Sequence, residues 1–455
     1  MHPTFNPRLQ KLFPQGKYHY RSDGFFEAIK NVWNVENLRL IFATNFIEFV
    51  DLYFFIHCAP IIEKIFCPPE LHGHMATFAL WISYFVPPCA ALFFAYIGDK
   101  RGRKVVMVYS SALMAALTIG LVMLPSYSEI GMTSLILFCL IRLAQAVSIA
   151  GEGACAWVFG FESTSTFPKT AFNVPFISMG EGLSGMASLG GFLFLFWAFS
   201  AIPEETIVRI LFGMLALGFL YVLWNRKRLQ DVEEYLEARS DMEYFRWLDM
   251  VDIAKYHKRQ VFFLMGIMML YPLAFNISYI YMPELMKLHC GFTDQDVMSH
   301  NIWITCSEMM ISVTAGYVAY KLEFHRIVDR KWLSLGMALV SLAASIALYA
   351  WFSTNTPTLF MITLTQVIIL FGVLNLAFLI GNFYKTFSVV GRYSCAAVSW
   401  AFARIIGMIC GIAPMMWLHS CGGYDYFIMF TIFSCIQCTC IYLSKTPSLP
   451  DFEYH

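Results

Sequence analysis

Two carboxylic acids lie three residues apart in a run of the chain that is otherwise almost entirely apolar and aromatic. The run "NFIEFVDLYFF" carries Glu48 and Asp51, and this spacing places both acids on one face of a helix. Two ionised carboxylates on one face repel each other, so one of the two is a candidate to hold a proton. A buried acid that gains and loses a proton near neutral pH is a candidate proton carrier.

A second set of polar residues follows one stripe of a predicted helix in "RLAQAVSIAGEG". Arg142, Gln145 and Glu152 recur there at helical spacing. Arg142 and Glu152 lie about 15 Å apart along the helix axis, too far to pair directly. We therefore expect each of them to find its partner on another helix.

Three further charged residues, Glu181, Glu308 and Arg404, lie in apolar runs. A charge inside a membrane needs a partner, a water-filled cavity or a neutralising proton. The guanidinium of Arg404 either binds an anionic substrate group or forms a structural pair. The acids are alternatively structural, bonded to hydroxyls or arginines without changing charge. This reading is favoured for Glu181 and Glu308, because each stands alone in its run.

The elements that position these residues follow from composition. Of 455 residues, 58% are hydrophobic, 17% aromatic and only 14% charged, which is typical of a membrane protein. Zero net charge leaves no basic excess for nucleic acid. The thirteen cysteines are scattered, and the tightest group, Cys435, Cys438 and Cys440, lacks nearby histidines, so no metal or other cofactor is expected. Because no nucleophile, base and orienting group occur at a recognisable spacing, we do not expect an enzyme.

Twelve apolar runs are long enough to cross a bilayer, which needs about 20 helical residues. They predict an all-α polytopic membrane protein with twelve transmembrane helices. The excess of Lys and Arg in alternate loops predicts that both termini are cytoplasmic, with only Lys64, Arg209 and Lys287 outside. The runs centre on residues 39–60, 76–97, 105–125, 133–158, 171–198, 206–224, 260–282, 298–320, 332–352, 358–381, 393–418 and 424–444.

A long polar interruption after the sixth run divides the chain into two halves of six helices. It carries both charge signs with apolar residues at helical spacing, which predicts a surface helix. Two six-helix bundles with a path between them are typical of a transporter. The predicted units are a cytoplasmic N-terminal segment (1–38), a first bundle (39–224), a cytoplasmic linker (225–259), a second bundle (260–444) and a cytoplasmic tail (445–455).

Four stretches resemble one family. "AYIGDKRGRKVVM", with Asp99 and Arg103, is similar to the loop signature G-x-x-x-D-[RK]-x-G-R-[RK] of the major facilitator superfamily. "NFIEFVDLYFF" is similar to the N-F-x-E-W-Y-D-F run in the first helix of its metabolite:H⁺ symporter family. "RLAQAVSIAGEGACAWVFGFE", which ends in Glu162, resembles the fourth helix of that family, and "GRYSCAAVSWAFARIIGMICGIAP" its eleventh.

This resemblance implies the major facilitator fold, alternating access and proton-coupled uptake at a bacterial inner membrane, by a protein expected to be a monomer. The family includes permeases for proline/betaine, citrate, dicarboxylates, oxoglutarate and shikimate. By the same resemblance, Asp99 locks the two bundles together on the cytoplasmic side, with Arg103 and Glu162 in the same charge network. Phe49 and Val50 replace the family's Trp and Tyr, so the substrate of better-matched relatives does not simply transfer.

The first hypothesis for the function is uptake of a small polar metabolite: a betaine- or proline-like osmolyte, an amino acid or a carboxylate. The alternatives are export or import of a siderophore, a drug or a larger polycarboxylate, or a sensor that has lost transport. Tyrosine faces would suit a quaternary ammonium group, although such tyrosines more often serve packing. The expected proton-coupling residues are Glu48, Asp51 and Glu152, and the expected substrate-binding residues are Arg142, Gln145, Tyr271, Tyr279 and Arg404.

Overall fold

The structure is a computed structural model of the 455-residue chain. It describes residues 24–72, 75–163, 170–199, 201–240, 245–324, 330–373, 375–420, 424 and 426–444. These residues form helices and their connections, and no strand occurs among them. The expectation of an all-α chain is therefore confirmed for the described residues.

In the described part of the chain, each of the twelve predicted spans falls on one helix or on consecutive helices. The first six correspond to α3 (Glu36–Phe66), α4 (Met75–Arg101), α5 (Arg103–Met123), α7 (Met132–Glu162), α8 (Thr170–Ala198) and α9 (Glu204–Arg226). Two short turns of helix, η1 (Pro69–Leu71) and α6 (Tyr127–Ile130), lie in the connections.

The second half contains several interrupted spans. The seventh is divided into α12 (Lys258–Met268), α13 (Leu270–Asn276), the π-helical turn η2 (Ile277–Tyr281) and α14 (Met282–Cys290). α15 (Asp294–Phe324) and α16 (Arg330–Thr354) follow, and the tenth span is α17 (Leu359–Val373) with α18 (Asn375–Thr386). The eleventh is α19 (Arg392–Ile406), the π-helical turn η3 (Gly407–Ile412) and α20 (Ala413–Ser420), and the last is α21 (Tyr426–Leu443).

Length and composition agree with a membrane location. Eight helical runs among the described residues are long and apolar enough to cross a membrane, and α17 and α21 are shorter apolar helices. α4 has 27 residues and α8 has 29, so each is about 40 Å long, which exceeds the hydrocarbon thickness of a bilayer. The chain is a multi-pass membrane protein.

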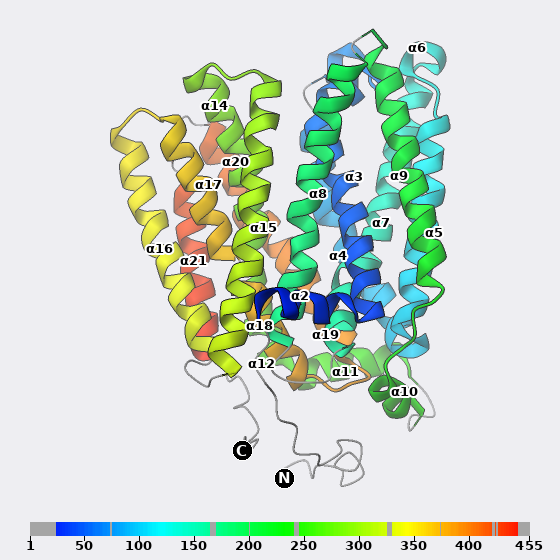
Figure 1. The fold of residues 1–455 in the computed structure, drawn as a ribbon, viewed down its shortest axis with the longest axis vertical. Helices are drawn as coiled ribbons and strands as arrows, with labels where there is room; N and C mark the ends of the chain where they lie inside the picture. The colour runs from blue at the N-terminus through cyan, green and yellow to red at the C-terminus, as the bar shows by residue number, and fades with distance from the viewer. Residues whose placement is uncertain are drawn as a thin grey trace.

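The two halves stand side by side, with α8 of the first half next to α15 of the second (Figure 1). Glycines on α8 allow this close approach. A Cβ added at Gly182 would lie 2.8 Å from the backbone oxygen of Thr305 on α15. Because Gly182 has no Cβ, the two backbones come close near the middle of the spans.

Short helices cross one end of the bundle, the end at which α21 finishes (Figure 1). We call this end the linker end. The interruption between the halves forms two helices, α10 (Glu233–Ser240) and α11 (Trp247–Tyr256), rather than a single surface helix. The N-terminal α2 (Phe25–Trp33) also lies here, with Phe25 5.1 Å from Tyr317 and Trp33 5.6 Å from Phe42 between ring centroids. It thus contacts both halves.

Candidate functional site

A buried ion pair joins α7 to α9 inside the first half. Glu152 pairs with Arg226, and Ser110 donates a hydrogen bond of 3.2 Å to the same carboxylate. Arg226 is only 1% exposed, and its Nε donates to the hydroxyl of Thr44 at 3.1 Å. The predicted end of the sixth span, at residue 224, stops short of this arginine, which lies in the last turn of α9. Glu152 therefore has the partner on another helix that its spacing required.

Arg142 of α7 pairs with an acid of α3. Its Nη1 lies 3.3 Å from Oδ2 of Asp51 and donates to Oε1 of Gln145 at 2.7 Å. Gln145 in turn donates to the hydroxyl of Thr118 at 3.1 Å. The guanidinium also lies 3.8 Å from the ring centroid of Phe55. Arg142 and Asp51 thus neutralise each other within the first half.

Glu48, the other acid of the opening run, lies within electrostatic range of both Arg226 and Asp51. It is part of the same region of α3 that faces α7 and α9. The structure therefore brings together the three acids predicted for proton coupling, Glu48, Asp51 and Glu152, in one half of the molecule, each close to an arginine.

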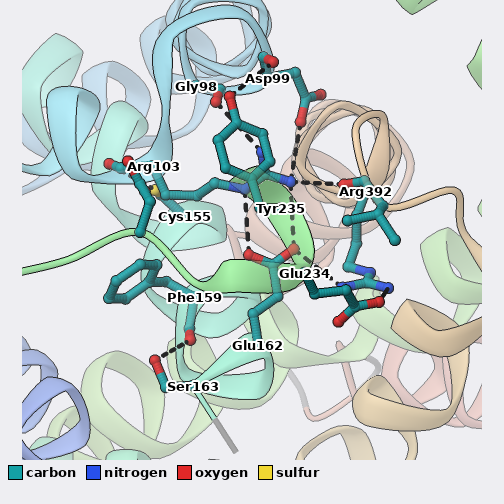
Figure 2. A network of polar contacts seen from close by, with 12 residues as sticks. Gly98, Asp99, Arg103, Cys155, Phe159, Glu162, Ser163, Glu234, Tyr235 and Arg392 are labelled. Carbon is teal, nitrogen blue, oxygen red and sulfur yellow. Dashed lines mark hydrogen bonds and ion pairs between the residues drawn. The ribbon is translucent and has the colours of Figure 1, made fainter. Parts of the chain in front are cut away.

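A second network of charges closes the linker end (Figure 2). Arg103 lies at its centre and is fully buried. Its Nη2 is 3.2 Å from Oδ1 of Asp99, and its Nε is 3.3 Å from Oε2 of Glu162. These contacts join α4, α5 and α7.

The same network crosses to the second half. Asp99 accepts hydrogen bonds from the backbone N–H of Ser394, at 2.9 Å, and from its hydroxyl. Arg103 donates to the carbonyl of Val389 at 2.8 Å, and Arg392 lies 3.1 Å from Glu162. The first half is therefore tied to the beginning of α19.

Glu234 and Tyr235 of the linker helix α10 add three contacts (Figure 2). Glu234 pairs with Arg392 at 3.4 Å, and the Tyr235 hydroxyl donates to the backbone carbonyl of Asp99 at 3.0 Å. The Tyr235 ring centroid lies 3.9 Å from the Arg103 guanidinium. Burial raises the pKa of the Tyr235 phenol to about 12, which keeps it protonated and able to donate.

A cavity of about 40 Å³ lies between the two halves. That volume holds on the order of three water molecules. Its walls come from α7 and α8 of the first half and from α13, α15 and α17 of the second. The lining residues are Trp157, Ser178, Glu181, Tyr271, Ala274, Phe275, Glu308, Ser312, Leu370 and Val373.

Two acids face this cavity from opposite halves. Glu181 of α8 accepts hydrogen bonds of 3.4 Å from Asn45 and 3.4 Å from Tyr271. Glu308 of α15 accepts a hydrogen bond of 2.9 Å from Tyr279. The partners recorded for both acids in the described structure are neutral side chains.

Aromatic rings continue from the cavity beside Glu308. Tyr279 lies 5.0 Å from Phe275 and 5.6 Å from Tyr53 between ring centroids, the latter pair edge to face. Tyr53 is 2% exposed and Tyr279 is 4% exposed. The acid therefore lies at the edge of a buried aromatic cluster formed by both halves.

No model of a known protein family matches the chain. Among curated proteins, a putative proline/betaine transporter of Staphylococcus aureus is 35% identical over 153 residues, which are 33% of this chain. The chain spans about a third, 31%, of the length of that relative. The proline/betaine transporter of Salmonella typhimurium is 24% identical over 402 residues, 82% of this chain and 75% of that protein. A putative metabolite transport protein of Haemophilus influenzae is 24% identical over 79% of the chain and 82% of its own length.

The solved structures give a fold match over nearly the whole chain. The proton:xylose symporter XylE, bound to a bromodeoxyglucose, superposes with a TM-score of 0.67 at 14% identity, covering 93% of this chain and 95% of that one. The transporter FucP in the outward conformation gives 0.65 at 12% identity, covering 94% and 100%. The chain has the major facilitator fold. The fold that the resemblance implied is thereby confirmed, and the relatives of the chain are named as transport proteins.

Within the major facilitator fold, the predicted substrate residues lie in three places. Tyr271 lines the central cavity and Tyr279 bonds to Glu308 at its edge. Arg142 and Gln145 are instead bonded to one another beside Asp51 and are not among the lining residues. Arg404 stacks on Trp400, with its guanidinium 4.1 Å from the ring centroid.

Glu181 and Glu308 are the acids that line the cavity. Each stands alone in an apolar run, so the sequence favours a structural role for both. The sequence does not reveal the contact between α8 and α15, which brings the two acids to one cavity. In the described residues no cluster of metal-binding side chains occurs.

Proposed function

We propose that the chain is a secondary transporter that moves a small polar metabolite by alternating access, coupled to protons. The observation that carries this proposal is the cavity lined from both halves, together with a charge network that joins the two halves at one end. The names of the relatives support it. A site shared by two rigid halves can open to either side as the halves rock.

The arginine pairs suggest how protons would act. A proton on Asp51 would neutralise it and weaken its contact with Arg142, and a proton on Glu152 would do the same for Arg226. Glu48 would share in this exchange through its closeness to both. Protonation in the first half would thereby change which contacts its helices favour.

In this proposal the substrate binds at the central cavity, and the gating residues lie at the linker end. Tyr271 and Tyr279 would contact the substrate at the cavity, while Arg142, Gln145 and Arg404 would be reached only after their present contacts rearrange. At the linker end the contacts of Asp99, Arg103 and Glu162 would break when that end opens.

In the cell, the proposal places the chain in a bacterial inner membrane as a monomer, with both termini and the linker end cytoplasmic. The working division into residues 39–224 and 260–444, joined by 225–259, is part of it. The alternative is a transporter or exporter of a siderophore, drug or larger polycarboxylate.

The test uses purified full-length protein in proteoliposomes. Betaines, amino acids, amines and di- or tricarboxylates are added outside while external pH and exchange of labelled compound are recorded. We expect one class to exchange and to drive external alkalinisation. Glu152→Gln should keep exchange and lose the pH signal, whereas Glu205→Gln, in an exposed pair with Arg209, should retain both.

Two outcomes would count against this proposal. If no compound of any class exchanges, transport by this chain is wrong. If a compound exchanges but moves no protons in the unmodified protein or in Glu152→Gln, the chain is a transporter and the proposed proton coupling is wrong.

A further inference from the structure

We propose that the central cavity binds a small organic cation, a primary or quaternary ammonium, with its charge between Glu181 and Glu308. The inference rests on the proposed function and narrows its substrate class. It excludes di- and tricarboxylates as preferred substrates and places zwitterions below cations. Two features of the structure support it: the residues that line the cavity, and the pairing of Arg142 and Arg226 with other acids.

The described lining contains carboxylic acids and no basic side chain. Glu181 and Glu308 are its ionisable acids, Ser178 and Ser312 are neutral, and no Lys, Arg or His lines it in the described structure. An anionic substrate would meet two carboxylates there and no compensating charge. Taking such an anion out of water would cost several kcal/mol, whereas a cation would gain from both acids.

The arginines of the first half are committed elsewhere. Arg142 faces Asp51 at 3.3 Å, and Arg226 pairs with Glu152. Both pairs lie among α3, α7 and α9, away from the α8–α15 boundary. They neutralise the acids beside them, and in the described structure no guanidinium is a direct hydrogen-bond or ion-pair partner of Glu181 or Glu308.

Neutral donors hold the two acids without cancelling their charge. Glu181 accepts hydrogen bonds from Asn45 and Tyr271, and Glu308 accepts one from Tyr279. An ionised carboxylate has about four acceptor sites, so each acid keeps capacity for an ammonium. Because their donors come from several helices, the carboxylates are held in place before any ligand arrives.

The aromatic lining fits the same class of ligand. Trp157, Tyr271 and Phe275 line the cavity, and Tyr279 packs against Phe275 at a 42° angle between rings. Aromatic faces attract ammonium groups, with tryptophan the strongest. Carboxylates together with aromatic faces thus provide both contacts that an organic cation uses.

The two acids also belong to opposite halves, Glu181 to α8 and Glu308 to α15. Ionised together in one cavity they repel, and a cation between them removes that repulsion and attracts both. Binding would therefore favour the closed arrangement in which α8 and α15 are in contact near Gly182.

The test compares probes that share a shape and differ in charge, on full-length protein in detergent. Equilibrium binding is measured for choline and ethanolamine, for 3,3-dimethyl-1-butanol as the uncharged counterpart of choline, and for glycine betaine, which adds a carboxylate. We expect a cation to bind more tightly than its uncharged counterpart by on the order of 30-fold, with glycine betaine between them. This comparison needs no variant.

Variants then locate the site. Glu181→Gln and Glu308→Gln should each weaken cation binding by on the order of tenfold or more, and the double variant should abolish it. Glu205→Gln, in the exposed pair with Arg209, should bind as the unmodified protein does. Thermal unfolding and gel filtration identify any variant that has failed to fold.

Three results would overturn the inference: equal binding of the neutral and charged probes, binding of carboxylates alone, or cation binding that survives the double variant. The last would make the two acids proton sites or structural groups. Failure of the proposed function is a separate result. If cations bind with this pattern but none enters proteoliposomes, the cation site is supported and the transport function is wrong. If a carboxylate is transported and cations do not bind, the transport function is supported and the cation site is wrong.

Discussion

The linker-end network and the central cavity both bury carboxylates, but they satisfy them differently. At the linker end, Asp99 and Glu162 each contact a guanidinium within 3.3 Å. At the cavity, the recorded partners of Glu181 and Glu308 are amide and phenol donors. An acid that is paired inside the protein holds two elements together. An acid that has only neutral donors can bind a cation or a proton that comes and goes. The acids at the linker end are therefore suited to holding the two halves together, and the acids at the cavity are suited to binding a ligand.

The largest effect is expected from Arg103→Ala at the linker end. It leaves the buried carboxylates of Asp99 and Glu162 without their shared partner, which should cost about 3–5 kcal/mol of stability. Cys155, fully buried with its Sγ 3.7 Å from the Arg103 carbonyl, should then become accessible to alkylation, read by peptide mass spectrometry. Arg246→Ala, in an exposed pair, is the control. Continued protection of Cys155 would show that the network does not hold this end closed.

A smaller effect is expected where α8 meets α15. In Gly182→Ala the new Cβ would approach the backbone of Thr305, and such overpacking costs about 1–3 kcal/mol. Thermal unfolding in detergent measures the loss. Gly190→Ala, on the same helix with nothing within 4 Å of its added Cβ, should be close to neutral or slightly stabilising. Equal effects of the two changes would mean that the halves do not pack tightly beside the cavity.

Ser394→Ala tests the link from α19 to the first half. It removes the hydroxyl donor to Asp99 and leaves the backbone donor at 2.9 Å, so a loss of about 1–2 kcal/mol is expected. A double-mutant cycle with Asp99→Asn separates this contact from general damage. Ser353→Ala, whose hydroxyl bonds to its own helix, serves as control. Strictly additive losses in the cycle would rule out a direct contribution from the pair.

The smallest effect is a pH dependence at the linker end, outside the spans. Burial lowers the pKa of His257, and its Nε2 accepts the backbone N–H of Ser388 at 3.3 Å. Because its pKa is lower when folded than unfolded, the stability it contributes is present above the unfolded pKa near 6.5 and lost as pH falls below it. Thermal unfolding between pH 7.5 and 5 should show this loss, reduced in His257→Gln. His289→Asn, at an exposed position, should leave the slope unchanged.

Much of the fold and part of the site could be predicted from the sequence. The spacing of Arg142 and Glu152 required partners on other helices, and the structure supplies Asp51 and Arg226. Arg226 itself was missed because it lies beside Lys227 and Arg228, where it resembles an ordinary charge of a polar linker. Only the inward turn of its side chain, toward Thr44 and Glu152, distinguishes it from them.

The sequence by itself determined where the helices run, because a backbone in lipid must satisfy its hydrogen bonds within each span and the apolar residues mark those spans. It also determined which buried charges needed partners. The tertiary structure alone decided the pairings and the cavity. Glu181 and Glu308 meet because small residues let α8 approach α15. Such contacts depend on the packing of helices far apart in the chain, and the period of any one helix does not encode them.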